Sequence, residues 1–303
     1  EELLRIAVAS TRFDTGRDPE IAFYGGTFTG LPRDVMEGLL QAAFPWVAGG
    51  PFRSVRVSTR PDALDGERLA LMKRYGVSTV ELGVQSMDDE VLRQSRRGYA
   101  SGDVRRAVDL LRGSGFRVGV QLMPGLPGDH VDRFLGTVDR CLDLRPDLVR
   151  LYPTLVLEGT LLAAWYREGR YRPFALNEAV ACCAEACSRF EAAAVPVVRM
   201  GLLAANDLLE EGGILAGPWH PAFGFLVRSA LYRRKIAQLL PEPFEGKPLR
   251  IAVHPRDVPL VRGYRNQGLR EVQEKTGAGS LEIVQDDSLA PGAPMGETTG
   301  RRA

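Results

Sequence analysis

Five short apolar stretches alternate with helical patterns in the first half of the chain, and this alternation limits the possible folds more than any other feature. The expected strands are Ile21–Tyr24, Ser54–Thr59, Thr79–Val84, Arg117–Met123 and Leu148–Tyr152. They recur at roughly 25–35 residues with a helical pattern between them, which is typical of parallel βαβ units. The sequence therefore predicts an α/β fold in which parallel strands close into a TIM-like (β/α) barrel or part of one.

Small, proline or polar residues follow each of these strands. The strand ends read Gly25-Gly26-Thr27, Thr59-Arg60, Gln85-Ser86, Pro124-Gly125 and Tyr152-Pro153. In a parallel barrel the ligand site lies at the carboxyl ends of the strands. Five such ends in succession predict one shared, ligand-binding rim.

The Gly25-Gly26 pair is the strongest single candidate on that rim. Without a Cβ atom, two glycines let the backbone approach a ligand closely, and their N–H and C=O groups can contact it directly. The alternative is an ordinary tight turn. The pair alone does not decide between the two readings.

The pattern changes beyond residue 160. A long helix is expected over Leu176–Ala194, then a strand over Pro196–Met200 and a basic amphipathic helix over Phe225–Leu240. Two further strands, Leu249–His254 and Leu281–Gln285, flank an expected helix near Val261–Thr276. The predicted organisation is a barrel core over 1–195, a small α/β extension over 196–287 and a disordered tail over 288–303.

Composition excludes some classes of protein. A formal net charge of +1 provides no global field for a nucleic-acid or membrane partner, so RNA binding would need a local basic patch. The sequence contains no apolar run long enough to span a bilayer and no secretory signal pattern. Three of the four cysteines, Cys182, Cys183 and Cys187, are clustered, unlike a secreted disulfide framework. A cytoplasmic location is the expectation.

Several motifs together resemble a radical S-adenosylmethionine (radical SAM) enzyme core. They are FYGGTFTGL (23–31), VSTRPDAL (57–64), ELGVQSMDDEVLRQSRRGY (81–99), QLMPGLPGD (121–129), VRLYPTLVLEGT (149–160) and GRYRPFALNEAV (169–180). The group most similar contains the Elongator catalytic subunit and oxygen-independent coproporphyrinogen oxidase, and the resemblance covers about residues 20–190. It implies a partial barrel of radical SAM type. The C-terminal third departs from the Elongator subunit, so acetyltransferase activity is not implied.

The resemblance also implies roles for individual residues. Gly25, Gly26 and Thr27 match the motif whose backbone holds the methionyl amino group of SAM. Gln85 and Ser86 match a strand-end pair that contacts the ribose or carboxylate, and Arg60 is placed to pair with the carboxylate. The remaining implied SAM contacts lie on the next two strand ends: Gln121, Met123, Pro124 and Gly125 beside the adenine, and Arg150 and Tyr152 facing the same mouth.

The cysteines do not fit the family pattern. The family binds a 4Fe-4S cluster through CxxxCxxC, which precedes the Gly-Gly strand, whereas this sequence has no cysteine before Cys141. The expectation is that the first strand and the cluster loop belong to a segment ahead of Glu1. Cys182, Cys183 and Cys187 have the wrong spacing and are expected to be buried thiols on a helix, as is Cys141.

The resemblance implies reductive cleavage of SAM to methionine and a 5′-deoxyadenosyl radical, with an electron donor such as flavodoxin or ferredoxin. Modification of tRNA or another RNA is the leading substrate class, and a small molecule such as a tetrapyrrole is second. One rival is a non-catalytic SAM- or RNA-binding relative without a cluster. Another is an ordinary barrel aldolase or isomerase, which would need a phosphate site or a lysine base, and none of the five strand ends contains a lysine.

Overall fold

The computed structural model describes residues 1–202, 212–239 and 246–298. The chain divides into two compact units. Unit 1 comprises Glu1–Thr154 with Phe190–Arg199, and unit 2 comprises Leu155–Arg189 with Met200–Ala303. Residues 155–189, which the sequence analysis assigns to the core, are grouped with the C-terminal residues in this division.

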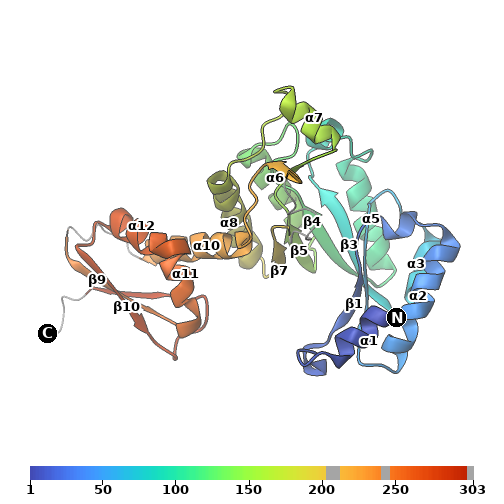
Figure 1. Ribbon diagram of the computed structural model, residues 1–303, viewed down its shortest axis with the longest axis horizontal. Coiled ribbons are helices and arrows are strands. Elements are labelled where there is room, and N and C mark those ends of the chain that lie inside the picture. The colour runs from blue at the N-terminus through green and yellow to red at the C-terminus, as the bar shows by residue number, and fades with distance from the viewer. Residues whose placement is uncertain (203–211, 240–245, 299–303) are drawn as a thin grey trace. The chain divides into compact units, whose positions relative to one another are not determined.

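Unit 1 is built on a six-stranded sheet with the order β1-β2-β3-β4-β5-β7. The strands are β1 (Glu20–Phe23), β2 (Ser54–Thr59), β3 (Val77–Gln85), β4 (Arg117–Leu122), β5 (Leu148–Leu151) and β7 (Val197–Met200). The pairs from β1 to β5 run parallel. The sheet is open and curved (Figure 1), so the predicted α/β partial barrel is confirmed.

The two faces of this sheet differ in polarity because successive side chains along a strand alternate between faces. Val57, Leu82 and Val120 are buried on the outer face, where helices cover them. Those helices, several of which lie along the outer side of the sheet in Figure 1, are α2 (Arg33–Ala48), α3 (Gly66–Arg74), α4 (Asp89–Gln94), α5 (Ser101–Gly113) and α6 (Val131–Asp143). An eight-residue helix, α1 (Glu2–Ala9), precedes β1. The inner face carries polar residues, including Arg56 and Glu81.

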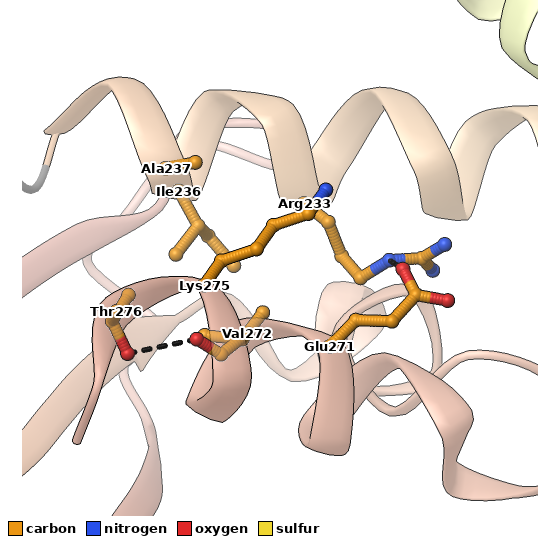
Figure 2. Close-up of a pocket in the computed structure, with 7 residues that line it drawn as sticks. All are labelled: Arg233, Ile236, Ala237, Glu271, Val272, Lys275 and Thr276. Carbon is orange, nitrogen blue, oxygen red and sulfur yellow. Dashed lines mark hydrogen bonds and ion pairs between the residues drawn. The ribbon is translucent and has the colours of Figure 1, made fainter.

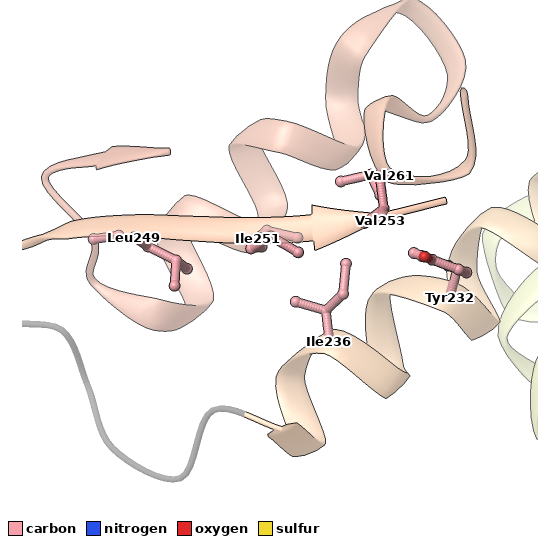
Figure 3. Close-up of a cluster of buried hydrophobic side chains, with 8 residues drawn as sticks. Tyr232, Ile236, Leu249, Ile251, Val253 and Val261 are labelled. Carbon is pink, nitrogen blue, oxygen red and sulfur yellow. The ribbon is translucent and has the colours of Figure 1, made fainter. Parts of the chain in front are cut away.

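Unit 2 has a separate core. Its three-stranded sheet, in the order β10-β9-β11, consists of β9 (Pro248–Val253), β10 (Ser280–Gln285) and β11 (Met295–Thr298). Helices α10 (Phe223–Leu239), α11 (Val258–Arg262) and α12 (Gln267–Thr276) contact this sheet or one another. Figure 3 shows Leu249 and Ile251 of β9 with Ile236 of α10 in one buried cluster.

The other elements of the second unit lie earlier in the chain. Helices α7 (Leu161–Arg167) and α8 (Leu176–Ala192) follow a short strand, β6 (Val156–Leu157), which pairs with β8 (Ile214–Ala216). The last three residues of α8, 190–192, belong to unit 1. Within the described ranges, no helix is long and apolar enough to cross a bilayer.

Two C-terminal predictions differ from the structure. The single helix expected near Val261–Thr276 is two helices, α11 and α12, separated by a turn over 263–266. A Gly-x-x-Asn sequence interrupts the pattern there, and both end residues accept the left-handed backbone. In the segment 288–303, where we predicted disorder, Met295–Thr298 pairs antiparallel with β9, and 299–303 lie outside the described residues.

Candidate functional site

The turn after β1 presents its backbone openly. Strand β1 ends at Phe23, and Gly25 has a φ of 116°, which L-residues with a side chain rarely adopt. No heavy atom lies within 4 Å of the position that a Cβ would take at Gly25 or at Gly26. Residues Phe23–Phe28, together with Leu31 and Leu39, line a pocket of about 200 Å³. Ligand atoms can therefore approach this backbone.

Two amide side chains meet at the ends of β3 and β4. Gln85 is 7% exposed and has a left-handed backbone, with a φ of 64°. Gln121 donates from Nε2 to Gln85 Oε1 over 3.2 Å. Gly83 makes room for the Gln85 side chain, since a Cβ at Gly83 would lie 2.7 Å from Gln85 Nε2. A strained residue held by its neighbours at a strand end is a feature often found in binding sites.

A buried carboxylate organises the inner face below the rim. Glu81, on β3, is 2% exposed and accepts hydrogen bonds from Tyr24 Oη at 3.0 Å and Arg56 Nη1 at 2.9 Å. Arg150 Nε lies 2.7 Å from Glu81 Oε2 in an ion pair, and Arg150 Nη1 donates to Tyr152 Oη at 3.0 Å. Burial, and after it the Glu81 charge, raises the pKa of Tyr24 to about 12. Tyr24 therefore stays a hydroxyl at neutral pH.

A second carboxylate also binds Arg56. Glu20, on β1, accepts hydrogen bonds from Arg56 and from Ser54 Oγ, the latter at 2.8 Å. Burial raises the pKa of Glu20, but the hydrogen bonds from Ser54 and Arg56 outweigh it and lower the pKa overall. Arg56 is thus held between two carboxylates, and its charge is neutralised.

Arg97 is a cation on the rim that sequence reasoning missed. Its Nη2 lies 3.3 Å from Met123 Sδ, and its buried Nε has no hydrogen-bond partner among the described residues. Burial lowers the pKa of Arg97, and no carboxylate contacts it in the described part of the chain. Arg60, the arginine expected to bind an anion, is instead held by Asp62 over 2.9 and 2.7 Å and by the Arg97 carbonyl. Of the two, Arg97 is the guanidinium left to bind an external anion.

The sequence contained little signal for this role. Arg93, Arg96 and Arg97 read together as a charged helical surface before Gly98. Only the packing distinguishes them: Arg93 pairs with Glu90 on the exposed surface of α4, whereas Arg97 turns inward to Met123.

The other predicted site residues do not all point towards the rim. Ser86 is buried, and its hydroxyl lies 3.1 Å from Thr137 Oγ1 of α6, on the helix side of the sheet. A SAM contact through that hydroxyl therefore has no support in the geometry. Gly125 N donates to Asp129 Oδ2 at 2.9 Å, which fixes the Pro124–Gly125 loop, and burial raises the pKa of Asp129 to about 6. Contacts join the remaining predicted residues in small groups: Met123 lies beside Arg97, which contacts Arg60, while Tyr152 is bonded to Arg150.

The cysteines form no cluster site. Cys141, Cys182, Cys183 and Cys187 are all buried on helices, and burial raises the pKa of Cys141 to about 12 and that of Cys183 well above its usual range. Within the described ranges, no three His, Cys, Asp or Glu residues are grouped so that they could hold a metal ion. The donors present do not fit an iron–sulfur cluster.

Two family profiles match the chain. The profile of the Radical SAM superfamily matches residues 1–141, and that of the Radical SAM C-terminal domain matches residues 146–233.

Among curated proteins, tRNA uridine(34) acetyltransferase of Methanocaldococcus infernus is 36% identical over 127 residues, which are 41% of this chain and 24% of that protein. Elongator complex protein 3 of Homo sapiens is 26% identical over 293 residues, 90% of this chain and 49% of that protein. The chain thus spans a quarter to a half of the length of these relatives. Among solved structures, the archaeal Elp3 of Methanocaldococcus infernus with an N-terminal deletion matches with a TM-score of 0.64 and 26% identity, covering 77% of this chain and 57% of that one.

Proposed function

Because this chain belongs to the radical SAM superfamily of enzymes, we propose that the rim of unit 1 binds S-adenosylmethionine. One observation carries the proposal. The open Gly25–Gly26 backbone and the carboxylate-free Arg97 guanidinium lie at the same, carboxyl edge of the sheet. The amino acid end of SAM carries an ammonium and a carboxylate, which need an acceptor and a cation respectively.

The remaining contacts follow from the chemistry of each group. Backbone carbonyls of the Gly25–Gly26 turn accept hydrogen bonds from the ammonium, and Arg97 binds the carboxylate. The paired amides of Gln85 and Gln121 are suited to ribose hydroxyls. Apolar and backbone atoms of the Met123–Gly125 segment contact the adenine.

In this superfamily, SAM that is reduced by a 4Fe-4S cluster supplies a carbon radical that removes hydrogen from a substrate. The described residues hold no ligand set for such a cluster, so this chain's residues are assigned SAM binding and no electron-transfer step.

We propose tRNA as the substrate class. This rests on the activity named for the tRNA acetyltransferase relatives and on the match to archaeal Elp3. Acetyl transfer is not part of the proposal, because the alignments leave half or more of each relative's length outside this chain.

The proposal is tested by calorimetric titration of SAM into the protein and two rim variants. Gly26→Val should abolish measurable binding, because its side chain enters open space in the free protein but blocks ligand approach. Arg97→Gln should weaken binding by about tenfold or more, the usual worth of a hydrogen bond to a charged group.

Matched controls are Gly49→Val, which also enters open space but lies away from the rim, and Arg93→Gln, which removes an exposed, paired arginine. Both should bind SAM like the unmodified protein. Unchanged affinity in both rim variants would overturn the proposed site.

A further inference from the structure

Unit 2 contains a βααβ segment that the rim does not use. Strand β9 leads into helix α11, a tight turn follows, and helix α12 returns to strand β10, which pairs parallel with β9. The turn is Gly263-Tyr264-Arg265-Asn266, referred to below as the GYRN turn. Its four residues join the two helices directly.

The GYRN turn is sharply bent and tightly supported. Gly263, Arg265 and Asn266 have φ values of 68°, 53° and 61°. Gly268 packs so close to the end of α11 that a Cβ there would lie 2.2 Å from the Val261 carbonyl oxygen. RNA-binding KH modules clamp backbone nucleotides with a Gly-x-x-Gly loop. Asn266 occupies the position of the second glycine, and asparagine is among the few side chains that tolerate its left-handed backbone.

The charges around the turn are not neutralised. Arg262, Arg265 and Arg270 are exposed, and no carboxylate contacts any of them in the described part of the chain. The stretch 258–270 contains no acidic residue. An unbalanced positive patch of this kind fits a phosphate backbone.

Two neighbouring arginines of α10, Arg233 and Arg234, are different, because they are already paired. Arg233 lies 3.0 Å from Glu271 (Figure 2), and Arg234 lies 2.9 Å from Glu185. These pairs stabilise the contact between helices and leave little charge for a ligand. The turn therefore offers cationic surface that Arg233 and Arg234 do not.

An aromatic side chain stands beside the cations. Tyr264 is 41% exposed, and the Arg265 guanidinium lies 5.3 Å from its ring centre. Tyr264 also borders a pocket of about 540 Å³ together with Leu226 and Gln267. Aromatic and apolar surfaces next to cations are what unstacked bases bind.

We propose that the GYRN turn and its three arginines bind a single-stranded stretch of nucleic acid. The backbone passes the turn, Arg262, Arg265 and Arg270 contact phosphates, and a base stacks on Tyr264. The site lies wholly within unit 2 and does not depend on SAM binding. The shared chemistry is a single-stranded polynucleotide, and RNA and DNA are the two possible sources.

The test measures fluorescence anisotropy of labelled ten-nucleotide RNA and DNA of one mixed sequence, with the whole chain and without SAM. At about 0.1 M salt, each phosphate contact releases roughly 0.7 counterions, which is worth about fivefold in affinity. Arg265→Gln should therefore weaken binding about fivefold and Arg265→Asp about 25-fold. Aspartate tolerates the left-handed backbone at this position, so the turn is retained.

The control is Arg5→Asp, which makes the same charge change at an exposed position of α1, in unit 1. It should bind like the unmodified chain, and circular dichroism should show that every variant is folded. Tighter binding of RNA than DNA identifies RNA as the source, and equal binding indicates recognition of the backbone alone. The proposal is overturned if neither oligonucleotide binds, or if Arg265→Asp binds both as tightly as the unmodified chain does.

Discussion

Replacing Glu81 by glutamine should destabilise unit 1 strongly although the two side chains have nearly the same shape. The Glu81 side chain is 3% exposed, and its partners Arg56 and Arg150 are 15% and 16% exposed. Arg56 keeps Glu20 as a partner. Arg150 loses the carboxylate that neutralises it, and its remaining hydrogen-bond partners among the described residues are the hydroxyls of Tyr152 and Tyr24. Removing one member of a buried ion pair typically costs about 3–5 kcal/mol, and because Arg56 stays paired we expect about 3 kcal/mol.

The measurement is urea unfolding in a background where Trp165 and Trp219 are replaced by phenylalanine, so that Trp46 alone reports on unit 1. Glu67→Gln is the control, because Glu67 forms an exposed pair with Arg33 at 3.0 Å, and such pairs contribute about 0–1 kcal/mol. If Glu81→Gln lowers the free energy of unfolding by no more than this control does, the buried network does not stabilise the sheet as argued.

Two further predictions concern titration and iron. The pKa of Asp129 is raised from 3.8 to about 6 by burial, so the folded state holds this proton more tightly than the unfolded state. The free energy of unfolding should therefore fall as the pH rises from about 4 to about 6, and Asp129→Asn should remove that part of the fall in urea titrations at each pH. Replacing the three cysteines of α8 by alanine should leave the iron bound after anaerobic reconstitution unchanged, because these thiols are buried. A loss of iron in that triple variant would show that α8 holds the metal.

The parallel strands could be predicted from sequence because two signals agree there. Apolar alternation and an abrupt small or polar strand end both mark β2, whose bounds Ser54–Thr59 match the expectation. Strand β3 starts two residues before its predicted start and ends one residue after its predicted end. At that end Gln85 adopts a left-handed backbone that no propensity scale would assign to glutamine.

The parts that could not be predicted depend on contacts between distant residues. Arg97 differs from Arg93 only in the direction of its side chain. Arg97 points towards Met123, which follows β4, whereas Arg93 pairs with Glu90 on α4. The sequence did not predict the break between α11 and α12, because apolar residues with helical spacing continue on both sides of Gly263. Likewise, Ser86 follows a strand as the rim residues do, yet its hydroxyl lies beside Thr137 of α6. The register of β3 against β4 shifts between Leu82 and Gln85, just before Ser86.

The buried carboxylate has a consequence for the width of the rim. A closed barrel fixes its own radius through its hydrogen bonds, whereas an open sheet has no such closure. Here Glu81 of β3 contacts Tyr24 after β1 and Arg150 of β5, and the Arg150 guanidinium lies 4.7 Å from the Tyr24 ring centre, so side chains four strands apart meet over the sheet. This network therefore fixes the distance between the Gly25–Gly26 turn and Tyr152. Substitution of Glu81, whose side chain is 3% exposed, would therefore change the width of the mouth without altering any atom on its surface.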